Sequence, residues 1–482
     1  MTLNEEYGSK LSFFSDPDRS ERAYKEILSI SHLKPFALDK QRIINSTSFR
    51  RLSNKTQMFT TVGNDAKRTR LTHTLEVEHI STIIAKALNL NTELCSAISL
   101  GHDIGHPPFG HTSERFMDRL STDDELLNKI ICLSNDLPPI TINENEHGFK
   151  HNWQGVRNIC DLENKHIQDI SNLKSYGFNL TYQTIWGILH HTKLTREKPD
   201  SFMNFYRQKY DKFINEKYLT IEALIVADAD ELAQRHHDVE DAIDVKLIDY
   251  NDILTEFEKL FNIHNNKFLV YEQTFKDKAT AITNYIIDTL ISIYLEDCLE
   301  KFRKNFASID IVKNETKDII KEKYVGFNSI HTESDKAFRK LIYEQITHSL
   351  PVQEMDGKAQ EIIESLVTIF LKNPKLLPDT TIKRLYRNIY EFFLNNKSKS
   401  KFFVSEKSTL LNLLEDRTHS GKLRVILSKY YKSIEGDTIQ MEKETRNDLY
   451  SILMRTIFDH ITCMTDKYAI NQFEMYFGRN YT

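Results

Sequence analysis

Apolar residues recur at the spacing of a helical turn along most of the chain. Residues 72–90, THTLEVEHISTIIAKALNL, show this pattern, with polar residues filling the gaps. Such a period is typical of an amphipathic helix, and the hydroxyls of Thr72 and Thr74 are suited to cap its first turn. The apolar positions of this predicted helix are Leu75, Ile80, Ile83, Ile84, Ala87 and Leu88.

Two further segments in the N-terminal half predict helices. Residues 92–103, TELCSAISLGHD, predict a short helix that Thr92 caps and that ends near Gly101. Residues 219–243 predict one longer helix, whose polar face is acidic and contains histidines.

Residues 55–68 are instead expected to be extended, because they alternate in polarity and then turn at the Gly-Asn-Asp sequence of residues 63–65. Beyond residue 250 the helical pattern returns. Its weak interruptions are residues 371–380 and the basic, Asn-rich residues 395–401, which we expect to form an exposed loop.

The pattern therefore predicts an all-α, multi-helix protein with a small hairpin in its N-terminal part and an extended C-terminal helical region. No interruption is strong enough to divide the chain, so we expect one continuous domain. Within it, residues 1–250 are expected to carry the chemistry, and residues 251–482 to complete the fold.

Composition supports this prediction and limits the functions. Gly (14) and Pro (10) are scarce among 482 residues, which favours helices. The formal charge is 64 − 69 = −5, so no overall positive field favours nucleic acid. The five cysteines are far apart and form no CxxC pair, which indicates reduced thiols and a cytoplasmic location. No signal peptide or membrane-spanning apolar run is apparent.

Titratable side chains concentrate in residues 99–116, SLGHDIGHPPFGHTSERF. Neighbouring residues of a helix diverge by about 100°, so His102 and Asp103 can reach one ion only where a helix ends and bends. With His73 and Asp230 they form a set of imidazole and carboxylate ligands that suits several divalent metals. A histidine on an apolar helix, such as His73, is more often a satisfied core residue, but an aspartate buried beside an imidazole needs a counter-charge.

Six blocks of the sequence, taken in order, resemble the HD-domain deoxynucleoside triphosphate triphosphohydrolases, the dGTPase-like branch of the HD phosphohydrolase superfamily. The resemblance extends from about residue 45 to residue 478 and implies an HD-domain fold with the HD catalytic core in its N-terminal part. The blocks are FRRLSNKTQMF, RTRLTHTLEVEHI, GHDIGHPPFGHTSE, FKHNWQG, ADADELAQRHHDVED and DHITCMTDKYAINQFEMYFG.

The resemblance implies one divalent metal ion per site, held by His73, His102, Asp103 and Asp230. Asp230 is preferred over Asp228 because the family has a second aspartate eight residues after the ligand, and from Asp230 this spacing leads to Asp238. Mg or Mn is expected as the metal, with Fe, Co, Ni and Zn as alternatives.

The implied reaction is hydrolysis of a dNTP, with dGTP expected, to a deoxynucleoside and inorganic triphosphate. Water attacks the α-phosphorus, and the 5′-oxygen leaves as a poor leaving group that needs a proton. His111 and Glu114 match the catalytic pair of the family, and His106 and His151 match further catalytic positions. Whether His111 acts as acid or base stays open at this level.

Substrate contacts are implied for eight residues of the matched blocks. A triphosphate favours arginines, the ribose 3′-hydroxyl suits Asp238, and Gln57 matches a glutamine that contacts the sugar. Gln234 departs from the family, which usually has at this position a tyrosine that helps to exclude a 2′-hydroxyl. The implied substrate contacts are Arg50, Arg51, Lys55, Gln57, Arg70, Asn152, Gln234 and Asp238.

Two alternatives remain at this level. One is an HD phosphohydrolase or phosphodiesterase with another nucleotide as substrate, for which Gln234 leaves room. The other is a non-catalytic, regulatory nucleic-acid-binding protein, since some members of the family bind single-stranded nucleic acid. The resemblance also implies a homo-oligomer, whose contacts we expect residues 251–482 to provide, with a nucleotide effector and no membrane partner. Control of the dNTP pool and defence against phage both fit.

Overall fold

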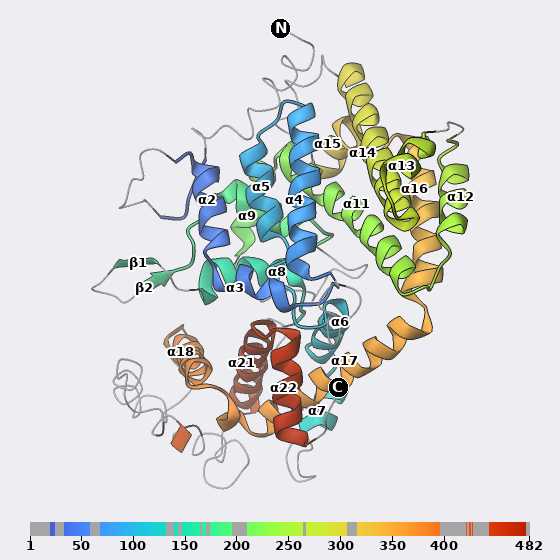
Figure 1. Cartoon of the computed structure of the whole chain (residues 1–482). Helices are drawn as coiled ribbons and strands as arrows, with labels where there is room; N and C mark the ends of the chain where they lie inside the picture. The colour runs from blue at the N-terminus through green and yellow to red at the C-terminus, as the bar shows by residue number, and fades with distance from the viewer. Residues whose placement is uncertain are drawn as a thin grey trace.

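The computed structural model is a helical protein with two packed cores (Figure 1). Our description covers residues 20–24, 33–57, 68–131, 139–142, 147–163, 166–169, 174–194, 210–263, 267–305, 316–395, 421, 424–425, 427 and 443–478.

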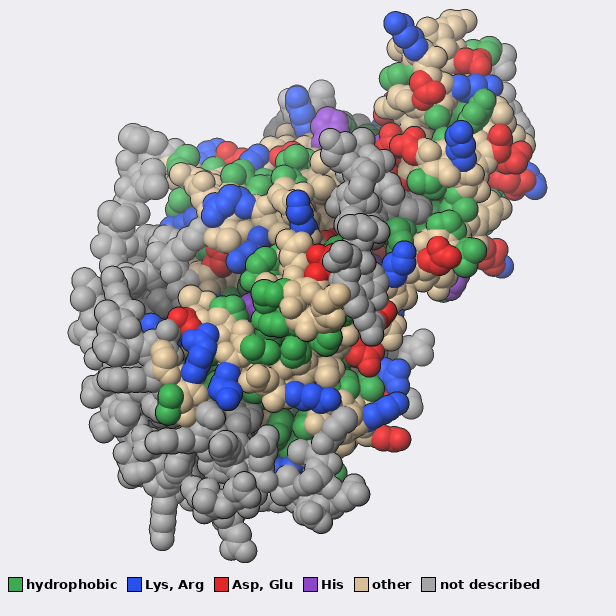
Figure 2. All heavy atoms as spheres, turned by 60° about the horizontal axis from the view of Figure 1, so that its bottom comes forward, with side chains coloured by type: hydrophobic (Ala, Val, Ile, Leu, Met, Phe, Trp, Pro, Cys, Tyr) green, Lys and Arg blue, Asp and Glu red, His purple; other side chains and the backbone are tan. Residues whose placement is uncertain are grey.

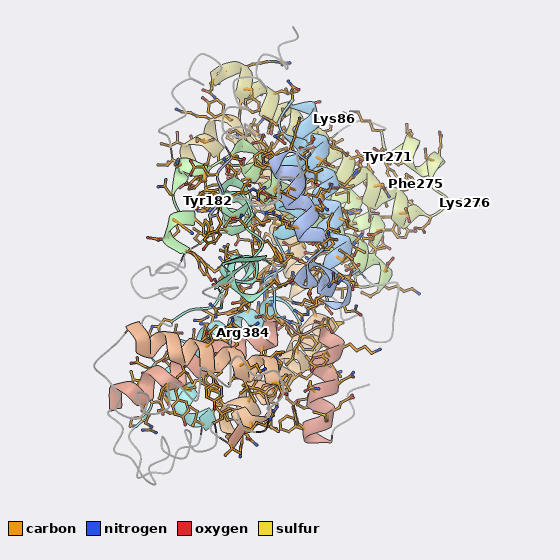
Figure 3. The ribbon with its side chains drawn as sticks, turned by 90° about the vertical axis from the view of Figure 1, so that its left-hand side faces the viewer. Lys86, Tyr182, Tyr271, Phe275, Lys276 and Arg384 are labelled. Carbon is orange, nitrogen blue, oxygen red and sulfur yellow. The ribbon has the colours of Figure 1, made fainter. Side chains whose placement is uncertain are left out.

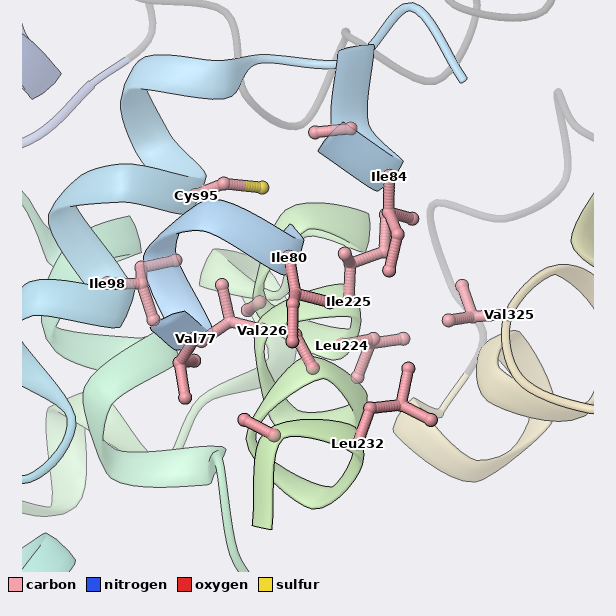
Figure 4. Packing of buried hydrophobic residues seen from close by; sticks show 14 of the residues in the cluster. Val77, Ile80, Ile84, Cys95, Ile98, Leu224, Ile225, Val226, Leu232 and Val325 are labelled. Atoms are coloured by element: carbon pink, nitrogen blue, oxygen red, sulfur yellow. The ribbon is translucent and has the colours of Figure 1, made fainter. Parts of the chain in front are cut away.

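The first core is built around three helices that pack side by side. Helix α4 (Arg70–Ala87), helix α5 (Thr92–Gly101) and helix α11 (Ile221–Asp244) contribute its centre, where their aliphatic side chains interdigitate (Figure 4). The side chains of Ile80 and Ile225 there are almost wholly withdrawn from solvent. Burial of this aliphatic surface is the main force that holds the three helices together.

The other helices of the first core surround this centre, and helices α12 to α16 form its right-hand side in Figure 1. They are α2 (Pro35–Ile44), α3 (Thr47–Arg51), α8 (His151–Arg157), α9 (Tyr182–His190), α12 (Tyr250–Leu260), α13 (Phe268–Thr274), α14 (Lys278–Asn305), α15 (Lys317–Tyr324) and α16 (Ser329–Ile342).

The second core lies below the first in Figure 1 and combines two distant parts of the sequence. Two short helices that follow the HD pair pack there against four C-terminal helices. Its helices are α6 (His111–Leu120), α7 (Asp124–Ile131), α17 (Leu350–Lys372), α18 (Asp379–Asn395), α21 (Lys443–Thr462) and α22 (Asp466–Phe477). The expected division near residue 250 therefore does not coincide with the two cores.

Buried polar contacts join the two cores. Arg157 of α8 donates through Nε and Nη2 to both carboxylate oxygens of Asp459 of α21, at 2.7 and 2.6 Å. The Lys55 ammonium donates to the carbonyl oxygens of His106 and Thr462, one on each side of the boundary. These contacts fix the loop after the HD pair against the C-terminal helices.

The helix starts differ slightly from the sequence-based prediction. Helix α4 begins two residues earlier than expected, and its cap is Thr69, whose side chain accepts from the N–H of Thr72 in a capping box. Helix α5 is capped by Asn91, whose side chain accepts from Leu94, and not by Thr92. A cap must precede the first helical residue, so the hydroxyl nearest to the apolar run was not the correct choice.

The predicted apolar face of α4 is also partly wrong. Ile80, Ile84 and Leu88 are buried, but Leu75 and Ile83 are 48% and 39% exposed. The face that packs instead includes Val77 and Ala85, and it also carries His73 and Thr74. The site-bearing face of this helix is thus polar at its N-terminal end, which weakens its apolar periodicity.

Extended structure occurs where the sequence did not predict it. Strand β1 (His166–Asp169) pairs antiparallel with strand β2 (Lys174–Tyr176). The turn predicted at residues 63–65 lies outside the described residues, as do residues 396–401 of the predicted basic loop. Near the first of these, Thr56 and Thr69 form an isolated antiparallel bridge.

Two absences concern only the parts of the chain described above. Cys95, Cys160, Cys298 and Cys463 form no disulfide there, as the sequence predicted for reduced thiols. No helix in the described ranges is both long and apolar enough to cross a membrane.

Candidate active site

Four predicted metal ligands converge at the centre of the first core. The Nε2 atom of His73 lies 2.9 Å from Oδ1 of Asp230, and Nε2 of His102 lies 3.7 Å from the same oxygen. Asp103 places its Oδ1 atom 3.7 Å from Nε2 of His102. Ligand atoms of the two histidines and Asp103 all lie within 4.8 Å of one another. The structure thus brings together residues that are up to 157 positions apart in the sequence.

The bend that aims His102 and Asp103 at one point depends on a close approach of two backbones. Helix α5 ends at Gly101, and the chain then passes against the start of α8. A Cβ atom on Gly105 would lie 1.9 Å from the carbonyl oxygen of His151 and 2.2 Å from the nitrogen of Gly155. Only glycine fits there, so Gly105 sets the path of the loop after the HD pair.

The donor atoms fit a divalent cation. Nδ1 of His102 lies 2.6 Å from the carbonyl oxygen of Ser99, and only a protonated Nδ1 can donate to it. This leaves the lone pair on Nε2, which is buried and has no hydrogen-bond partner among the described atoms. A buried nitrogen lone pair that faces two carboxylates is unfavourable without a cation between them. The first-row transition metals and Mg all remain compatible with this set of nitrogen and oxygen ligands.

A second layer of side chains orients His73. Its Nδ1 lies 3.1 Å from Nδ1 of His237, and Nε2 of His237 donates to the carboxylate of Glu76. Glu76 also bonds His236, so the carboxylate orients two neighbouring imidazoles. This chain of contacts directs Nε2 of His73 toward Asp230, in the manner of carboxylate–histidine–metal relays.

The carboxylates of the ligand set stay ionised in spite of their burial. Burial alone would raise the pKa of Asp103, but the Arg70 guanidinium and the imidazoles of His106 and His102 hold it well below its usual range. Burial would also raise the pKa of Asp230, but the contact with His73 and the imidazoles of His102, His73 and His191 together lower it. Both groups are thus ready to bind a cation at neutral pH.

Arg70 takes up its position because a glycine leaves room for it. Its Nη1 atom donates to Oδ2 of Asp103 at 2.8 Å, and the side chain is 2% exposed. Gly110 has a φ of +59°, and a Cβ atom there would lie 2.4 Å from Nη2 of Arg70. Gly110 therefore meets two demands, a left-handed backbone and close contact with the guanidinium.

Asp228, the competing ligand candidate, faces away from this group. The hydroxyl of Tyr294 donates to its Oδ2 at 2.8 Å, and the ammonium of Lys321 donates to its Oδ1. Opposite sides of one turn of α11 therefore give the two aspartates different surroundings, one at the ligand group and one against α14 and α15.

A second group of titratable side chains lies at the start of α6. Nδ1 of His111 lies 2.9 Å from Oε2 of Glu114, and Nδ1 of His151 lies 3.0 Å from the same oxygen. The backbone N–H of His151 also donates to Oε1 of Glu114, at 3.2 Å. Burial would raise the pKa of Glu114, but His151 and His111 hold it well below its usual range. His111 itself has a side chain that is 58% exposed.

His106 connects the two groups. Its ring stacks on that of His151, with centroids 3.7 Å apart, and its Nδ1 atom lies 2.7 Å from Oδ1 of Asp103. Burial, followed by the positive charge of Arg70, lowers the pKa of His106 well below its usual range, so the ring is neutral. Ligand atoms of His106, His111, Glu114 and His151 also lie within 4.8 Å of one another.

Two of the implied substrate contacts lie on one face of α11. Gln234 and Asp238 follow Asp230 at helical spacing and line a groove of about 470 Å³ between α11 and α16. Asp238 is buried, and burial together with Asp241 raises its pKa to about 7. Because this pKa is close to neutral, a hydroxyl or a cation placed beside Asp238 would change its protonation state.

Several other residues that the resemblance implied as substrate contacts form hydrogen bonds within the protein instead. Arg50 is exposed and donates to the Asn45 carbonyl oxygen. Lys55 is buried and donates to two backbone carbonyl oxygens, and burial lowers its pKa to about 8. Asn152 donates to the Leu189 carbonyl oxygen at 2.7 Å. Gln57 keeps a buried Oε1 without a partner among the described atoms, and Arg51 faces a pocket at the boundary of the two cores.

Sequence reasoning missed the residues that support the ligands. Glu76 lies three residues after His73, and His237 lies seven after Asp230, so each shares a helix face with a ligand. His191 was also missed, although its Nε2 lies 3.1 Å from Nε2 of His151. Helical spacing from the ligands would have found Glu76 and His237, whereas His191 approaches only through packing of α9.

Known families match the chain over this site. The HD domain family matches residues 70–235, a range that includes all four proposed ligands, and the Phosphohydrolase-associated domain matches residues 325–389.

Curated relatives extend the similarity along most of the chain. A "Deoxyguanosinetriphosphate triphosphohydrolase-like protein" of Rickettsia felis is 30% identical over 375 residues, which cover 76% of this chain and 87% of the relative. Proteins of the same description from Geobacter metallireducens and Rickettsia bellii are 30% and 29% identical, and each aligns with 76% of this chain. The alignments cover 84% of the Geobacter relative and 87% of the other.

An all-helical fold with a buried His–His-Asp–Asp cluster, matched by the HD domain family, defines an HD-domain phosphohydrolase. Within that class, the chain belongs to the family of deoxyguanosinetriphosphate triphosphohydrolase-like proteins, a branch of the dNTP triphosphohydrolases.

Proposed function

We propose that this protein hydrolyses deoxynucleoside triphosphates, with dGTP as the first substrate to test, to a deoxynucleoside and inorganic triphosphate. The observation that carries the proposal is the buried, unpartnered Nε2 of His102, which faces the carboxylates of Asp103 and Asp230. The names of the curated relatives support the substrate class.

His73, His102, Asp103 and Asp230 would hold one divalent ion, with Mg or Mn as the expected metal. When bound, such an ion polarises a phosphate oxygen and lowers the pKa of a bound water. The two imidazoles are already oriented toward this site, because Ser99 fixes the ring of His102 and His237 fixes that of His73.

His111 is proposed to donate the proton that the departing 5′-oxygen needs. Glu114 accepts from Nδ1–H of His111, so Nε2 is the atom that can exchange a proton with the substrate. As the water oxygen bonds to the α-phosphorus, the bond to the 5′-oxygen breaks, and that oxygen takes the proton from His111. The water keeps one proton as the new hydroxyl of the triphosphate, and its other proton passes to solvent, from which His111 is protonated again. The exposure of the His111 side chain supports this exchange with solvent. His106 and His151 support the pair from the buried side.

Arg70 and the groove on α11 would bind the substrate. Arg70 is a fixed guanidinium beside Asp103 and suits the phosphate oxygens. Asp238 would accept the 3′-hydroxyl of the sugar, and Gln57, with its unpartnered Oε1, would contact the sugar as well. Arg50, Lys55 and Asn152 are engaged in contacts within the protein and are not included in this proposal.

The first experiment is a panel of four dNTPs and four NTPs with Mg or Mn, with the products resolved by ion-exchange chromatography. The proposal expects free deoxynucleoside and triphosphate in equal amounts, and no product from His102→Ala. Release of orthophosphate or pyrophosphate by the wild-type protein would contradict it. Asp228→Asn is the control, because Asp228 lies on the same helix as the proposed ligand Asp230 but binds Tyr294 and Lys321.

A second candidate, hydrolysis of ribonucleotides or another nucleotide ester, is favoured by one observation. Gln234 lines the groove where the family usually has a tyrosine that helps to exclude a 2′-hydroxyl. Equal rates on NTPs and dNTPs, with Gln234→Tyr restoring a preference for dNTPs, would select this candidate.

A further inference from the structure

The helix that carries His111 and Glu114 begins without a side chain to cap its first turn. The N-cap residue of α6 is Gly110, so no side-chain oxygen is available there to accept from the first N–H groups. Ser113 donates its hydroxyl to the carbonyl oxygen of Pro108, which ties the turn to its own loop. The first turn of a helix frays readily, so its orientation depends on contacts from elsewhere in the fold.

Asp356 of α17 makes such a contact from the second core. Its Oδ1 accepts from the hydroxyl of Thr112 at 2.6 Å, and its Oδ2 lies 3.4 Å from Nη2 of Arg115. Nη2 of Arg115 also donates to the hydroxyl oxygen of Thr112 at 3.0 Å. These two residues of α6 directly follow His111 and Glu114, so one carboxylate contacts the turn beside each member of the proposed catalytic pair.

The contact of Asp356 with Thr112 is the stronger of the two. Thr112 is buried, whereas the side chain of Arg115 is 63% exposed. A hydrogen bond from a buried hydroxyl to a carboxylate is strengthened by the charge, and an exposed ion pair is weakened by solvent. Asp356 therefore acts on α6 chiefly through the hydroxyl of Thr112.

Helix α17 also contacts the groove between α11 and α16. It follows the π-helix η9 (Tyr343–Thr347), whose two end residues line that groove. Gln353 of α17 donates to the carbonyl oxygen of Thr347 at 3.2 Å, and Asp356 lies one turn further along. Figure 1 shows α17 extending from the lower end of α16 to α6 and α7. One helix thus connects the proposed sugar-binding groove with the helix that carries the proposed acid.

The surroundings of α17 favour a local effect of Asp356. The side view of Figure 3 shows the second core as a separate layer, with Arg384 of α18 at its upper edge and Tyr182 of α9 in the layer above. Figure 2 turns the lower layer forward, and lysine, arginine and acidic side chains are interspersed over its described surface. A substitution of Asp356 therefore changes one contact and not a surface of uniform charge.

We propose that Asp356 is a positioning residue, which holds the first turn of α6 through Thr112 so that His111 and Glu114 are in place for the substrate. The inference rests on the proposed function, because it assumes that His111 gives its proton to the 5′-oxygen. Asp356 acts through Thr112 and does not itself exchange a proton. A displacement of a reacting group by about 1 Å can cost about a hundredfold in rate, so a small movement of this turn is enough to matter.

The metal site should be spared by a change at Asp356. The four proposed metal ligands lie on or next to α4, α5 and α11, whose helices belong to the first core. Loss of the contact with Thr112 should therefore lower kcat and leave the metal content and KM at their wild-type values.

The first test is a double-mutant cycle on the full-length protein. Asp356→Ala removes the acceptor and Thr112→Val removes the donor, and each should lower kcat about tenfold. Because both changes break the same contact, the double variant should be little slower than either single variant. Thr112→Ser keeps the hydroxyl and should recover most of the kcat that Thr112→Val loses. Glu354→Gln is the matched control, because Glu354 is an exposed carboxylate two residues away on α17, and it should keep the wild-type kcat.

The second test needs no turnover. In hydrogen–deuterium exchange without nucleotide, the backbone N–H groups of residues 114–117 should exchange about tenfold faster in Asp356→Ala than in Glu354→Gln. Exchange in α21 should be equal in the two variants, which a general loss of stability would not allow.

The two tests separate the failure of this inference from that of the proposed function. Equal exchange of residues 114–117 in Asp356→Ala and Glu354→Gln would overturn the contact. Faster exchange with an unchanged kcat, or a double variant about a hundredfold slower than the wild type, would overturn the positioning role. If the wild type hydrolysed no dNTP, the proposed function would fail, and exchange alone would decide whether Asp356 holds α6.

Discussion

The two histidine groups at the candidate active site differ in exposure and in which core holds them. His102 is wholly buried, whereas the side chain of His111, nine residues later, is 58% exposed. His102 follows a helix of the first core, but His111 begins α6, whose apolar side packs in the second core. His102 belongs to the group that we propose to hold an ion, and His111 is the exposed member of the group that we propose to act on the substrate.

This difference shows how one short loop serves two purposes. Residues 102–110 leave the first core and enter the second, and both cores hold the loop in place. Asp103 is held by Arg70 from α4, and Phe109 donates its N–H to Asp466 of α22 at 3.0 Å. The relative position of the two groups therefore depends on the contact between the cores.

Removal of a buried ligand should have the largest effect. Asp103→Asn takes away a ligand charge and the partner of Arg70, so we expect loss of bound metal and a fall in kcat of at least about a thousandfold. Metal content by mass spectrometry and initial rates would check this. Metal retained at the wild-type stoichiometry would show that the buried group is not the metal site.

The second-largest effect is expected from a mutation that weakens the contact between the two cores. Asp459→Asn leaves Arg157 buried without its full counter-charge, which costs about 3–5 kcal/mol of stability. Calorimetry should show a lower melting temperature, and the transition of the C-terminal helices should separate from that of the first core. A single transition at the wild-type temperature would rule out this contact as the link between the cores.

A change in the second group, which contains His111 and Glu114, should reduce turnover without loss of the bound metal. Glu114→Gln removes the charge that orients His111 and His151, and we expect a fall in kcat of about a hundredfold. Metal content should stay at the wild-type value, unlike that of Asp103→Asn. If Glu114→Gln also lost the metal, the division into a holding group and a reacting group would be wrong.

Asp238 offers a smaller, pH-dependent test on the helix that carries Asp230. Its folded pKa of about 7 lies above the ordinary value of 3.8, so the folded state favours the protonated form. The stability that the protonated Asp238 carboxyl contributes to the folded state is fully present below about pH 4 and is lost as the pH rises through 7. Asp238→Asn should therefore gain stability relative to the wild type between pH 4 and 8, by on the order of 4 kcal/mol.

Urea unfolding of the two proteins at pH 4.5, 6 and 8, without metal, would measure this difference. Asp244→Asn, close to the exposed end of the same helix, is the control and should show a smaller change. A stability difference that does not vary with pH would mean that Asp238 is already ionised in the folded protein.

Part of the site could be predicted from short-range sequence patterns. The ends of α5 and α11 agree with the sequence to within a residue or two, because long amphipathic periods are strong local signals. The clustering of His102, His106, His111 and Glu114 is visible in the sequence because these residues share one loop. The support of His73 by His237 and Glu76 escaped notice, since each residue also fits an ordinary polar helix face.

The sequence by itself determined the helical class, the family and the residues that can bind a metal, because periodicity, glycine placement and motif order are properties of the chain. Only the tertiary structure showed that Asp228 and Asp230 have different surroundings. Two residues apart on one helix, they face different neighbours, and packing gives one to Tyr294 and Lys321 and the other to His73. It also decided which acid pairs with a buried cation such as Arg157, since that partner lies 302 residues away.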